Sequence, residues 1–453
     1  MSTVVEPILT PSSLFSVTNA FFYLLIPIVV LWYAYFRMCR KRLYELAAEI
    51  PGPVGLPLIG NAYEFMGDSN KIFENIYDKS FEYAKDGLPA KIWIGPRLIV
   101  FLTDPRDVEI ILSSSVYIDK APEYRFFQPW LGNGLLISTG DTWRAHRKLI
   151  APTFHLNVLK SFMGLFNTNS RLAVEKMRKE GTKAFDVHHY MSEATVEILL
   201  ETAMGVDKGT QEASGFEYAA AVMKLCDILH LRHTKVWMRP DFLFNMTKYA
   251  KEQVKLLDFV HGLTINVSYT EKVVEELEQI FGDSDRPCTF QDTLEMKYLE
   301  RCIMETLRMY PPVPIIAREL QQEVQLKSTN LSVPAKCTVI IGTLKLHRNP
   351  KIYPNPEHFD PDNFLPEKTS NRHYYAFVPF SAGPRSCVGR KYAMLKLKIL
   401  LSTILRNYKV YSDIPQKDWK LQADIILKRS DGFMIRLEPR KMKPKPANVA
   451  TAN

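Results

Sequence analysis

The chain has 453 residues, of which 46% are hydrophobic, 24% charged and 11% aromatic. This composition excludes a disordered chain, a collagen-like chain and a small disulfide scaffold, and it is sufficient to bury a large core. Lysine and arginine exceed aspartate and glutamate by 58 to 49, which gives a net charge of +9, but the excess is spread along the chain. Because no basic stripe interleaved with aromatic residues is present, we predict no nucleic-acid partner.

The cysteines give no sign of an oxidising compartment or of a metal held by protein side chains alone. None of the six belongs to a CxxC pair, and their spacing is irregular. We therefore expect neither a disulfide framework nor a zinc site, and we predict a domain that faces the reducing cytosol. The six residues are Cys39, Cys226, Cys288, Cys302, Cys337 and Cys387.

An apolar segment near the N-terminus predicts a membrane anchor. Residues 14–36 carry no charge, and basic residues crowd positions 37–42 directly after it. About 20 apolar residues cross the hydrocarbon layer, and the positive flank predicts a lumenal segment at 1–13 followed, after the span, by a cytosolic chain. The alternatives are a buried core helix and a cleaved signal peptide, although a signal peptide carries its positive charge before the apolar run.

Residues 37–60 are predicted to form a basic and proline-rich hinge. Within it, the prolines of residues 51–60 fix the backbone φ angle and lack an amide donor, which favours a semi-rigid spacer over a helix or a strand. An ordinary surface loop has the same composition and remains the alternative. The globular body then occupies residues 61–440, and a basic flexible tail follows at 441–453.

Hydrophobic periodicity in the body predicts mainly α structure with small β-sheets. Two predicted strands meet at the Gly95–Pro96 turn. One predicted helix ends before Gly282, because glycine is favoured just beyond the end of a helix. Proline-rich chain at 349–366 is predicted to be irregular. The predicted strands fall within residues 91–102, 324–331 and 338–341, and the predicted helices include 191–204, 216–231, 270–281, 292–310 and 390–407.

The most specific pattern is FSAGPRSCVG, from Phe380 to Gly389. Its glycines allow close approach of the backbone, and Arg385 offers a cation to an anionic group. Cys387 precedes a helix. The dipole of that helix and the nearby cations both favour a thiolate over a thiol. A thiolate is a strong ligand for iron, and a haem supplies both iron and anionic propionates. On residue types alone, a buried structural cysteine is an equal alternative.

This ten-residue segment resembles the haem-binding loop of the cytochrome P-450 family, FxxGxRxCxG, at every fixed position. The resemblance implies the fold of that family and a bound haem b with the thiolate of Cys387 on its iron. It also implies a monooxygenase of the endoplasmic reticulum membrane, which receives electrons from NADPH through a flavin reductase. The implied haem-contacting residues of this loop are Phe380, Gly383, Arg385, Cys387 and Gly389.

Three further segments agree with the family. Trp143 and Arg147 match its WxxxR element, which reaches a haem propionate, and Arg318 is implied as another propionate contact. Glu305 and Arg308 match the ExxR ion pair that braces the core, and their spacing places both on one helix face. By residue type alone, Glu305 and Arg308 would form an ordinary surface ion pair, and Arg147 and Arg318 would be solvated.

One position departs from the family pattern. The segment around Asn363 matches the PERF-like segment of the family, but Asn363 stands where an arginine is usual. The identity of the third member of the ExxR network is therefore open at this stage.

Longer stretches at 137–155, 185–206 and 371–398 resemble insect family 4, subfamily G. That resemblance implies long-chain aliphatic substrates and the oxidative decarbonylation of fatty aldehydes in cuticular hydrocarbon synthesis. Family 4 as a whole implies the alternative of fatty acid hydroxylation at the end of the chain.

Basic residues after Cys387 predict a docking surface for an acidic electron donor, which the resemblance identifies as the NADPH-dependent reductase. A solvated helix face is the plain alternative. The residues are Arg390, Lys391, Lys396, Lys398 and Arg406.

One element of the family has no counterpart in the sequence. A distal helix normally carries the pattern [AG]Gx[DE]T[TS], but residues 262–270 lead into the next helix without an acid-threonine pair. Gly262 and Thr264 are a poor substitute, since no carboxylate lies between them. We therefore predict that the chain joins two segments near Thr264 and lacks the distal wall and its proton delivery. The alternatives to an active enzyme are an impaired or inactive haem-binding isoform and a membrane protein without haem.

Overall fold

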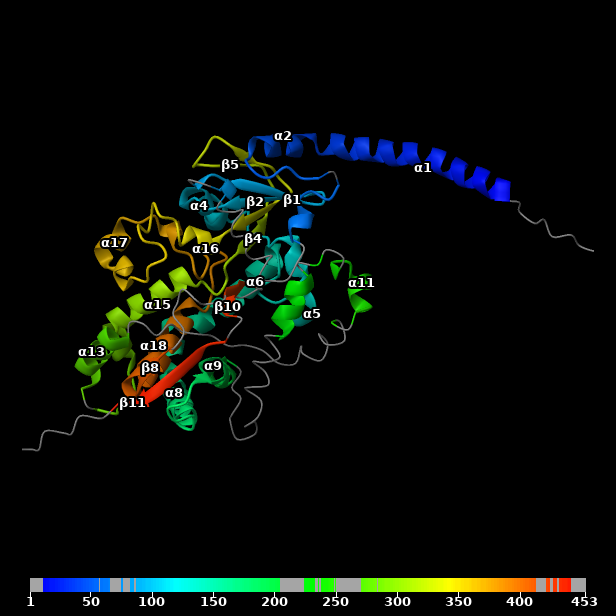
Figure 1. Ribbon diagram of the computed structural model, residues 1–453. Helices are drawn as coiled ribbons and strands as arrows, with labels where there is room; N and C mark the ends of the chain where they lie inside the picture. The colour runs from blue at the N-terminus through cyan, green and yellow to red at the C-terminus, as the bar shows by residue number, and fades with distance from the viewer. Residues whose placement is uncertain are drawn as a thin grey trace, which may run out of the picture.

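A computed structural model describes most of the chain (Figure 1). One long helix extends away from a compact body in which helices and small sheets are packed together. The described residues are 11–56, 58–65, 75, 82–84, 87–203, 224–232, 235, 238–247, 249, 270–282, 284–412, 421–423, 427–429 and 432–440.

The N-terminal apolar segment is a helix, α1 (Pro11–Cys39), which fits a single-pass membrane anchor. Its stretch Asn19–Cys39 has a mean hydropathy of 1.7, and none of it is buried against the body. α2 (Lys41–Glu49) follows after one residue. The predicted membrane segment therefore has the length and composition that a span requires.

Several contacts attach α2 and the hinge to the body. Tyr44 stacks on Trp93 with ring centroids 5.2 Å apart. The Lys91 ammonium donates to the carbonyl of Ala47 at the end of α2, and the Lys91 amide donates to the Pro51 carbonyl at 2.8 Å. These contacts fix the direction in which the chain enters the body from α1.

The main sheet has the strand order β1-β2-β7-β4. β1 and β2 form the predicted antiparallel hairpin around Gly95, whose φ of +57° suits the turn. β7 runs parallel to β2 and antiparallel to β4, so this sheet joins the start of the body to its second half. The bounds are β1 (Ala90–Ile94), β2 (Arg97–Leu102), β4 (Ile316–Glu319) and β7 (Thr338–Ile341).

Three smaller sheets complete the strand pairing of the described residues. One has the order β3-β11-β8, one pairs β9 with β10, and one pairs β5 with β6. Their bounds are β3 (Phe185–Asp186), β5 (Val324–Gln325), β6 (Ser332–Val333), β8 (Tyr408–Tyr411), β9 (Leu421–Ala423), β10 (Leu427–Arg429) and β11 (Met434–Pro439).

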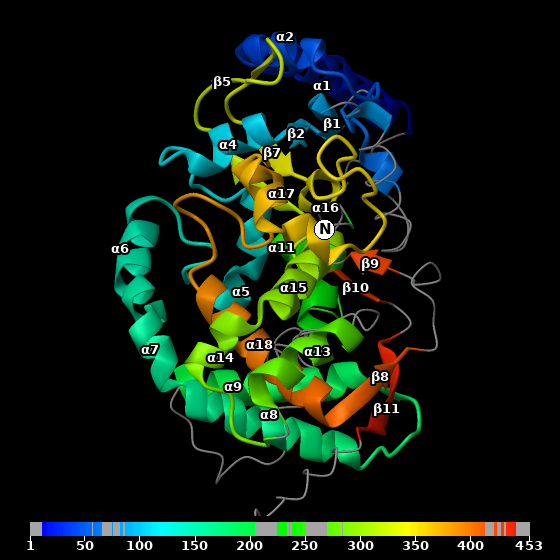
Figure 2. The same cartoon turned by 90° about the vertical axis from the view of Figure 1, so that its left-hand side faces the viewer.

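A helical core surrounds α18, which lies among the other long helices of the body (Figure 2). Phe166, Ile198, Leu277, Ile303 and Ile399 are all buried in one cluster and come from five different helices. This burial of apolar side chains is the main source of stability for the helical half. The five helices are α8 (Met163–Arg178), α9 (Val187–Ala203), α13 (Thr270–Phe281), α15 (Lys297–Met309) and α18 (Arg390–Asn407).

Shorter helices cover the outside of the body, with α6 and α7 along one edge (Figure 2). The α-helices are α4 (Pro105–Ser113), α5 (Gln128–Leu131), α6 (Gly140–Ile150), α7 (Leu156–Ser161), α11 (Asp241–Asn245), α14 (Phe290–Glu295), α16 (Thr343–Leu346) and α17 (Pro366–Ser370). The 3-10 helices are η1 (Ala62–Phe65), η3 (Pro122–Phe127), η4 (Ala151–Phe154), η7 (Pro361–Phe364) and η8 (Tyr374–Ala376).

Two predicted elements differ from the structure. The helix predicted at 292–310 is divided into α14 and α15, because Met296 has a non-helical ψ of 67°. The carboxylate of Glu276 on α13 accepts from the amides of Tyr298 and Leu299, and so caps the new start at α15. The strand predicted at 324–331 is only two residues long, since the rest forms the connection to β6.

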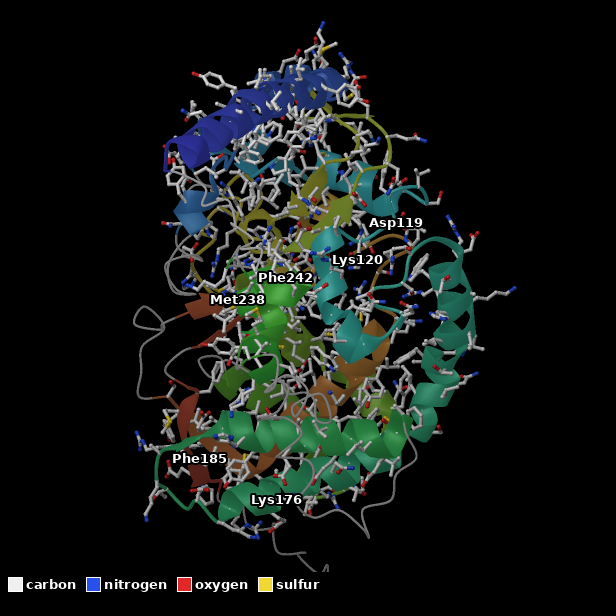
Figure 3. The ribbon with its side chains drawn as sticks, turned by 90° about the vertical axis from the view of Figure 1, so that its right-hand side faces the viewer. Asp119, Lys120, Lys176, Phe185, Met238 and Phe242 are labelled. Atoms are coloured by element: carbon white, nitrogen blue, oxygen red, sulfur yellow. The ribbon has the colours of Figure 1, made fainter. Side chains whose placement is uncertain are left out.

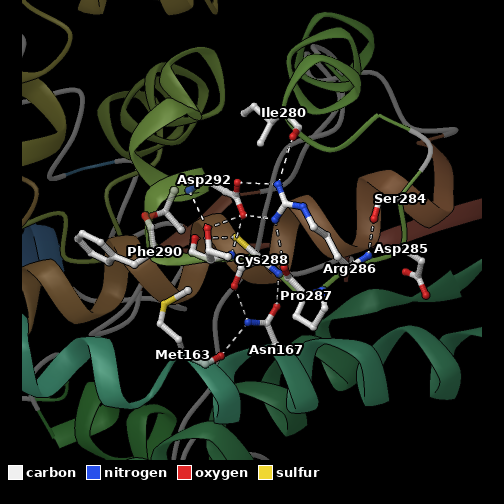
Figure 4. A network of polar contacts seen from close by, with 12 residues as sticks. Met163, Asn167, Ile280, Ser284, Asp285, Arg286, Pro287, Cys288, Phe290 and Asp292 are labelled. Atoms are coloured by element: carbon white, nitrogen blue, oxygen red, sulfur yellow. Dashed lines mark hydrogen bonds and ion pairs between the residues drawn. The ribbon is translucent and has the colours of Figure 1, made fainter.

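A polar network ties the loop after α13 back to α8 (Figure 4). The amide of Cys288 donates to the Asn167 side chain at 2.8 Å, and the Asn167 side chain donates to the Cys288 carbonyl at 2.8 Å. Arg286 pairs with Asp292, whose carboxylate also accepts from the Thr289 amide at 2.7 Å. The chain that follows residue 270 is therefore fixed firmly to the helical core.

Candidate active site

The predicted cysteine loop forms a tight turn before α18. The amide of Cys387 donates to the Phe380 carbonyl at 2.8 Å, and the amide of Ser386 donates to the Gly383 carbonyl at 3.0 Å. Gly383 has a φ of +66°, and a Cβ atom there would lie 1.8 Å from the Leu112 carbonyl oxygen. Only glycine fits this position, since both its backbone angle and its contact with α4 exclude a side chain.

Cys387 lies three residues before α18 begins, and the residue is exposed although the loop partly desolvates its sulfur. Desolvation raises its pKa, and the opposing effects of the Gly389 amide and of Arg147 are smaller. This is a correction to the sequence-based argument, which expected the helix end and nearby cations to lower the thiol pKa. The Gly389 amide and Arg147 do act in the expected direction, but the argument left out the desolvation of the sulfur by the surrounding loop.

α6 brings two predicted residues to this loop. Nη1 of Arg147 donates to the Ser386 carbonyl at 2.7 Å. Trp143 is the buried residue of α6, and the Arg385 guanidinium carbon lies 4.6 Å from the centroid of its ring. The WxxxR spacing places both side chains on the face of α6 that looks toward the loop, one helical turn apart.

Arg385 is held by backbone carbonyls. Its guanidinium donates to the carbonyls of Ile118 (2.8 Å), Leu135 (3.1 Å) and Ser138. Burial first, and then the charge of Arg318, lower its pKa to about 10. Arg385 therefore orders the chain that leads into α6 as well as carrying positive charge toward the site.

Arg318 and Lys120 form a second concentration of positive charge. Arg318 is 1% exposed, and its Nη2 atom has no hydrogen-bond partner in the part of the chain that the structure describes. Residues 120 and 318 face each other in an antiparallel bridge. Burial, then Arg318 and Arg385, hold the pKa of Lys120 well below its usual value. A buried arginine with an open donor beside two other cations calls for an anionic partner.

Lys120 was missed by the sequence reasoning. Figure 3 labels Lys120 beside Asp119, on the segment that leads into η3. No motif singles out a lysine at this place, and its significance comes only from the pairing with Arg318 on β4. The sequence offers only a weak signal for Lys120, namely its position between a buried isoleucine and the WxxxR segment.

Glu305 and Arg308 form a fully buried ion pair on α15, both 0% exposed. Nη2 and Nε of Arg308 each donate to the Glu305 carboxylate at 2.7 Å. The remaining donors of Arg308 bind the carbonyls of His347 (3.0 Å), Pro356 (2.8 Å) and His358 (3.1 Å). The pair therefore ties α15 to the irregular chain after α16 through bonds that involve a charged group.

Asn363 takes the third position of this network. Its side-chain amide donates to the Glu305 carboxylate at 3.2 Å, and the amide of Asp360 donates to the same carboxylate at 2.8 Å. Arg372 donates to the Asn363 carbonyl and lies over the Tyr353 ring. The departure from the family pattern thus keeps a hydrogen bond to Glu305, with a neutral amide in place of a guanidinium.

The predicted basic docking surface is only partly exposed. Lys396 and Lys398 are buried, and Lys398 donates to Glu300 at 2.7 Å and to the Thr293 carbonyl at 2.6 Å. Their assignment to a docking surface was wrong, because α18 is a core helix whose faces are almost all covered. Arg390 and Lys391 at its start are exposed.

Comparison with protein families decides the identity of the fold. The family model described as cytochrome P450 (written P-450 here) matches residues 50–268 and 263–437. The chain belongs to the cytochrome P-450 family. As a member of this family it is a haem-thiolate monooxygenase, and the sequence-based identification is confirmed.

Curated relatives confirm the resemblance to family 4, subfamily G. The chain is 49% identical to cytochrome P-450 4g15 of Drosophila melanogaster, over 95% of this chain and 98% of the relative. It is 42% identical to cytochrome P-450 4g1 of the same organism, over 90% and 92%. Cytochrome P-450 4V2 of Homo sapiens is 32% identical over 85% and 88%.

The comparisons also bear on the length of the chain. The family model matches in two pieces that overlap at residues 263–268. The alignment with cytochrome P-450 4g15 has 570 positions, which is 117 more than the 453 residues of the whole chain. At least 117 positions of that relative therefore lack a counterpart here. The predicted junction near Thr264 lies outside the described residues, as do Gly262 and residues 441–453.

The described residues fit the haem of this family. The sulfur of Cys387 is a suitable iron ligand, and Gly389 keeps the space beside it free of a side chain, since a Cβ there would lie 3.9 Å from Sγ. The open Nη2 donor of Arg318 offers positive charge to acidic groups, and an anion bound there would favour the charged form of Lys120. The family thus supplies a group that accounts for both the free thiol and the unbalanced charge.

Proposed function

We propose that Cys387 ligates the iron of a haem b and that the cations around it hold the propionates. The family pattern implies four propionate contacts, which are Trp143, Arg147, Arg318 and Arg385. We add Lys120, because it faces Arg318, whose Nη2 donor is open, in an antiparallel bridge. Phe380, Gly383 and Gly389 shape the loop around the ligand, and Glu305 with Arg308 braces the core behind it. The single observation that carries this proposal is that Arg385, in the loop of Cys387, lies within electrostatic reach of the buried Arg318, whose Nη2 has no hydrogen-bond partner within the described residues.

We further propose that the substrate is a long-chain aliphatic molecule, and specifically a fatty aldehyde that is converted to a hydrocarbon one carbon shorter. When bound, haem supplies the iron chemistry that activates dioxygen. The protein residues orient the haem, keep the thiolate in place and exclude competing ligands from it. The similarity to the subfamily G relatives supports this choice over fatty acid hydroxylation at the end of the chain.

The proposed location is the membrane of the endoplasmic reticulum, with α1 as a single-pass anchor. Exposed apolar side chains lie near α1: Val54 is 92% exposed and Leu58 71%. Phe242 on α11 is 68% exposed and faces the viewer in Figure 3, which looks from the side toward which α1 extends in Figure 1. A body that rests on lipid with this side would take an apolar substrate directly from the membrane.

The proposed electron donor is an NADPH-dependent flavin reductase that docks beside the cysteine loop. Lys148 on α6 and Lys391 at the start of α18 are exposed, and Arg147 links α6 to the loop. This basic surface would attract an acidic partner, and salt would weaken the attraction. Replacing Lys148 and Lys391 by alanine should raise the reductase concentration needed for half-maximal turnover at low ionic strength. The exposed Lys179 at the end of α8 is the matched control, and equal effects of both changes would contradict this docking surface.

A second candidate function is an impaired or inactive haem-binding isoform. The two-piece family match and the at least 117 unmatched positions favour it, because they agree with a missing distal segment. The residues that would guide protons to bound dioxygen would then be absent, while the proximal loop would remain.

Turnover separates these functions. The full chain in lipid vesicles, with reductase and NADPH, is given a long-chain fatty aldehyde and, separately, the corresponding fatty acid. Hydrocarbon from the aldehyde supports the first proposal, and a hydroxylated fatty acid would replace it by the alternative chemistry. A chain that carries haem and gives neither product supports the impaired isoform. Cys387→Ala is the control that must abolish any product.

A further inference from the structure

A buried histidine connects the core ion pair to the cysteine loop. His347 follows α16 and is 0% exposed. Its backbone carbonyl accepts from Nη1 of Arg308 at 3.0 Å. Its ring atom Nε2 accepts from the amide of Val378 at 2.9 Å. The main chain of His347 therefore contacts the ExxR pair, and its side chain contacts the segment just before the cysteine loop.

Val378 lies at the entrance to the loop. Its carbonyl accepts from the amide of Ser381 at 3.0 Å, in a turn where Ser381 has a φ of +58°. Phe380, in the same turn, accepts from the amide of Cys387 at 2.8 Å. A shift of Val378 would thus move the turn that sets the position of the Cys387 backbone.

The ring of His347 is suited to act as a hydrogen-bond acceptor. Its ring centroid lies 5.1 Å from that of Phe377, which fixes the ring orientation. Burial and the charge of Arg308 lower its pKa to about 3, so the ring is neutral at physiological pH. Because Nε2 accepts, the proton is on Nδ1, which lies toward the backbone of Leu307 and Arg308.

We propose that His347 is a positioning residue for the haem ligand, which transmits the fixed geometry of Glu305 and Arg308 to Cys387 through its bond to the Val378 amide. This inference rests on the proposed role of Cys387 and goes beyond it, since His347 is not among the residues proposed to contact the haem. This role of residue 347 requires a hydrogen-bond acceptor atom at the position that Nε2 occupies.

Two variants and one control test the acceptor. His347→Phe keeps an aromatic ring against Phe377 but removes the acceptor, whereas His347→Gln retains an acceptor oxygen. His358→Phe is the control, since the His358 carbonyl also accepts from Arg308 but its side chain is exposed. Each full-length variant is compared by amide hydrogen exchange at Val378 and by the Soret band of the reduced carbon-monoxide complex, which distinguishes thiolate from thiol ligation.

The expected result is specific to the acceptor. Loss of a buried hydrogen bond costs about 1–3 kcal/mol, so exchange at Val378 should be roughly 5-fold to 150-fold faster in His347→Phe. Thiolate ligation should fall in the same variant. His347→Gln should restore most of both properties, and His358→Phe should match the wild type. The proposal is overturned if His347→Gln is as impaired as His347→Phe, or if His347→Phe keeps both the slow exchange and the thiolate band.

The two proposals can fail separately. Exchange at Val378 is measured without reference to haem, so it reports on His347 even if Cys387 is not the ligand. Conversely, a Cys387→Ala chain with an unchanged haem spectrum would refute the ligand assignment, while the exchange result for His347 would still stand.

Discussion

Arg147 on α6 donates a 2.7 Å hydrogen bond to the carbonyl of Ser386, the residue directly before Cys387. The WxxxR element on α6 thus contacts the cysteine loop through a side chain that also carries positive charge. This contact links the two segments of the chain that the proposed haem would lie against.

Arg147→Ala should weaken haem retention. The change removes a charged hydrogen bond to the loop, worth about 1.5–3 kcal/mol, together with one cation of the site. We expect roughly 10-fold to 100-fold faster loss of haem to an acceptor protein, measured by absorbance. Arg144→Ala is the control, since Arg144 lies on the same helix but pairs with the exposed Asp141. Equal rates for both variants would show that Arg147 does not hold the site.

Glu305→Gln should destabilise the fold strongly. The change leaves the Arg308 guanidinium buried without its counter-charge, which typically costs about 3–5 kcal/mol. The measurement is the free energy of unfolding from urea titration, with Arg301→Gln as the control on the same helix. Arg301 pairs with the half-exposed Asp362 at 3.0 Å, so its loss should cost about 1 kcal/mol or less. A smaller loss for Glu305→Gln than for the control would contradict the bracing role.

Asn363→Ala tests the unusual third position of the ExxR network. The substitution removes one hydrogen bond to Glu305 and should cost about 1 kcal/mol of unfolding free energy. Asn363→Asp should cost more, because it adds a second carboxylate beside a buried one. Similar urea midpoints for the two variants would mean that the side chain of Asn363 does not act on Glu305.

The network in Figure 4 predicts a loss of stability at low pH. The hydrogen bonds from Arg286, and those from Thr289, lower the pKa of Asp292 to about 2. A carboxylate with a depressed folded-state pKa contributes its stability above the unfolded value of about 4, and this is lost as the pH falls toward 2. We expect Asp292→Asn to be up to about 2 kcal/mol less stable than the wild type at pH 6.

The same comparison at low pH provides the check. The difference between the wild type and Asp292→Asn should shrink between about pH 4 and pH 2, because the wild-type carboxylate is then protonated as well. Asp285→Asn is the control, since Asp285 is 78% exposed and lies 3.8 Å from Arg171. A difference that stays constant down to pH 2 would contradict the role of Arg286.

Local patterns explain what could be predicted from the sequence. The cysteine loop, the ExxR pair and the β1–β2 hairpin are set by a few neighbouring residues, and helix α18 has the predicted bounds of 390–407. The role of Gly383 could be inferred in kind, although its actual neighbour, the Leu112 carbonyl, comes from a distant helix.

Other features depend on contacts between distant segments. The helix at 292–310 is divided because Glu276 of α13 caps the start of α15, which no local pattern records. Lys396 and Lys398 are buried because α18 is surrounded by other helices, so their charges did not indicate a surface. Lys120 lies at the site only because it pairs with Arg318. Desolvation, which the helix-end argument left out, raises the thiol pKa of Cys387.

Cys387 is proposed here as the thiolate ligand of a haem, and one spectrum tests this role. The most direct measurement is the reduced carbon-monoxide difference spectrum of the purified full-length protein beside that of Cys387→Ala. We expect the Soret band of a thiolate-ligated haem in the wild type and its complete loss in Cys387→Ala. A wild-type protein with no such band after haem is supplied, or a variant with the wild-type spectrum, would contradict it.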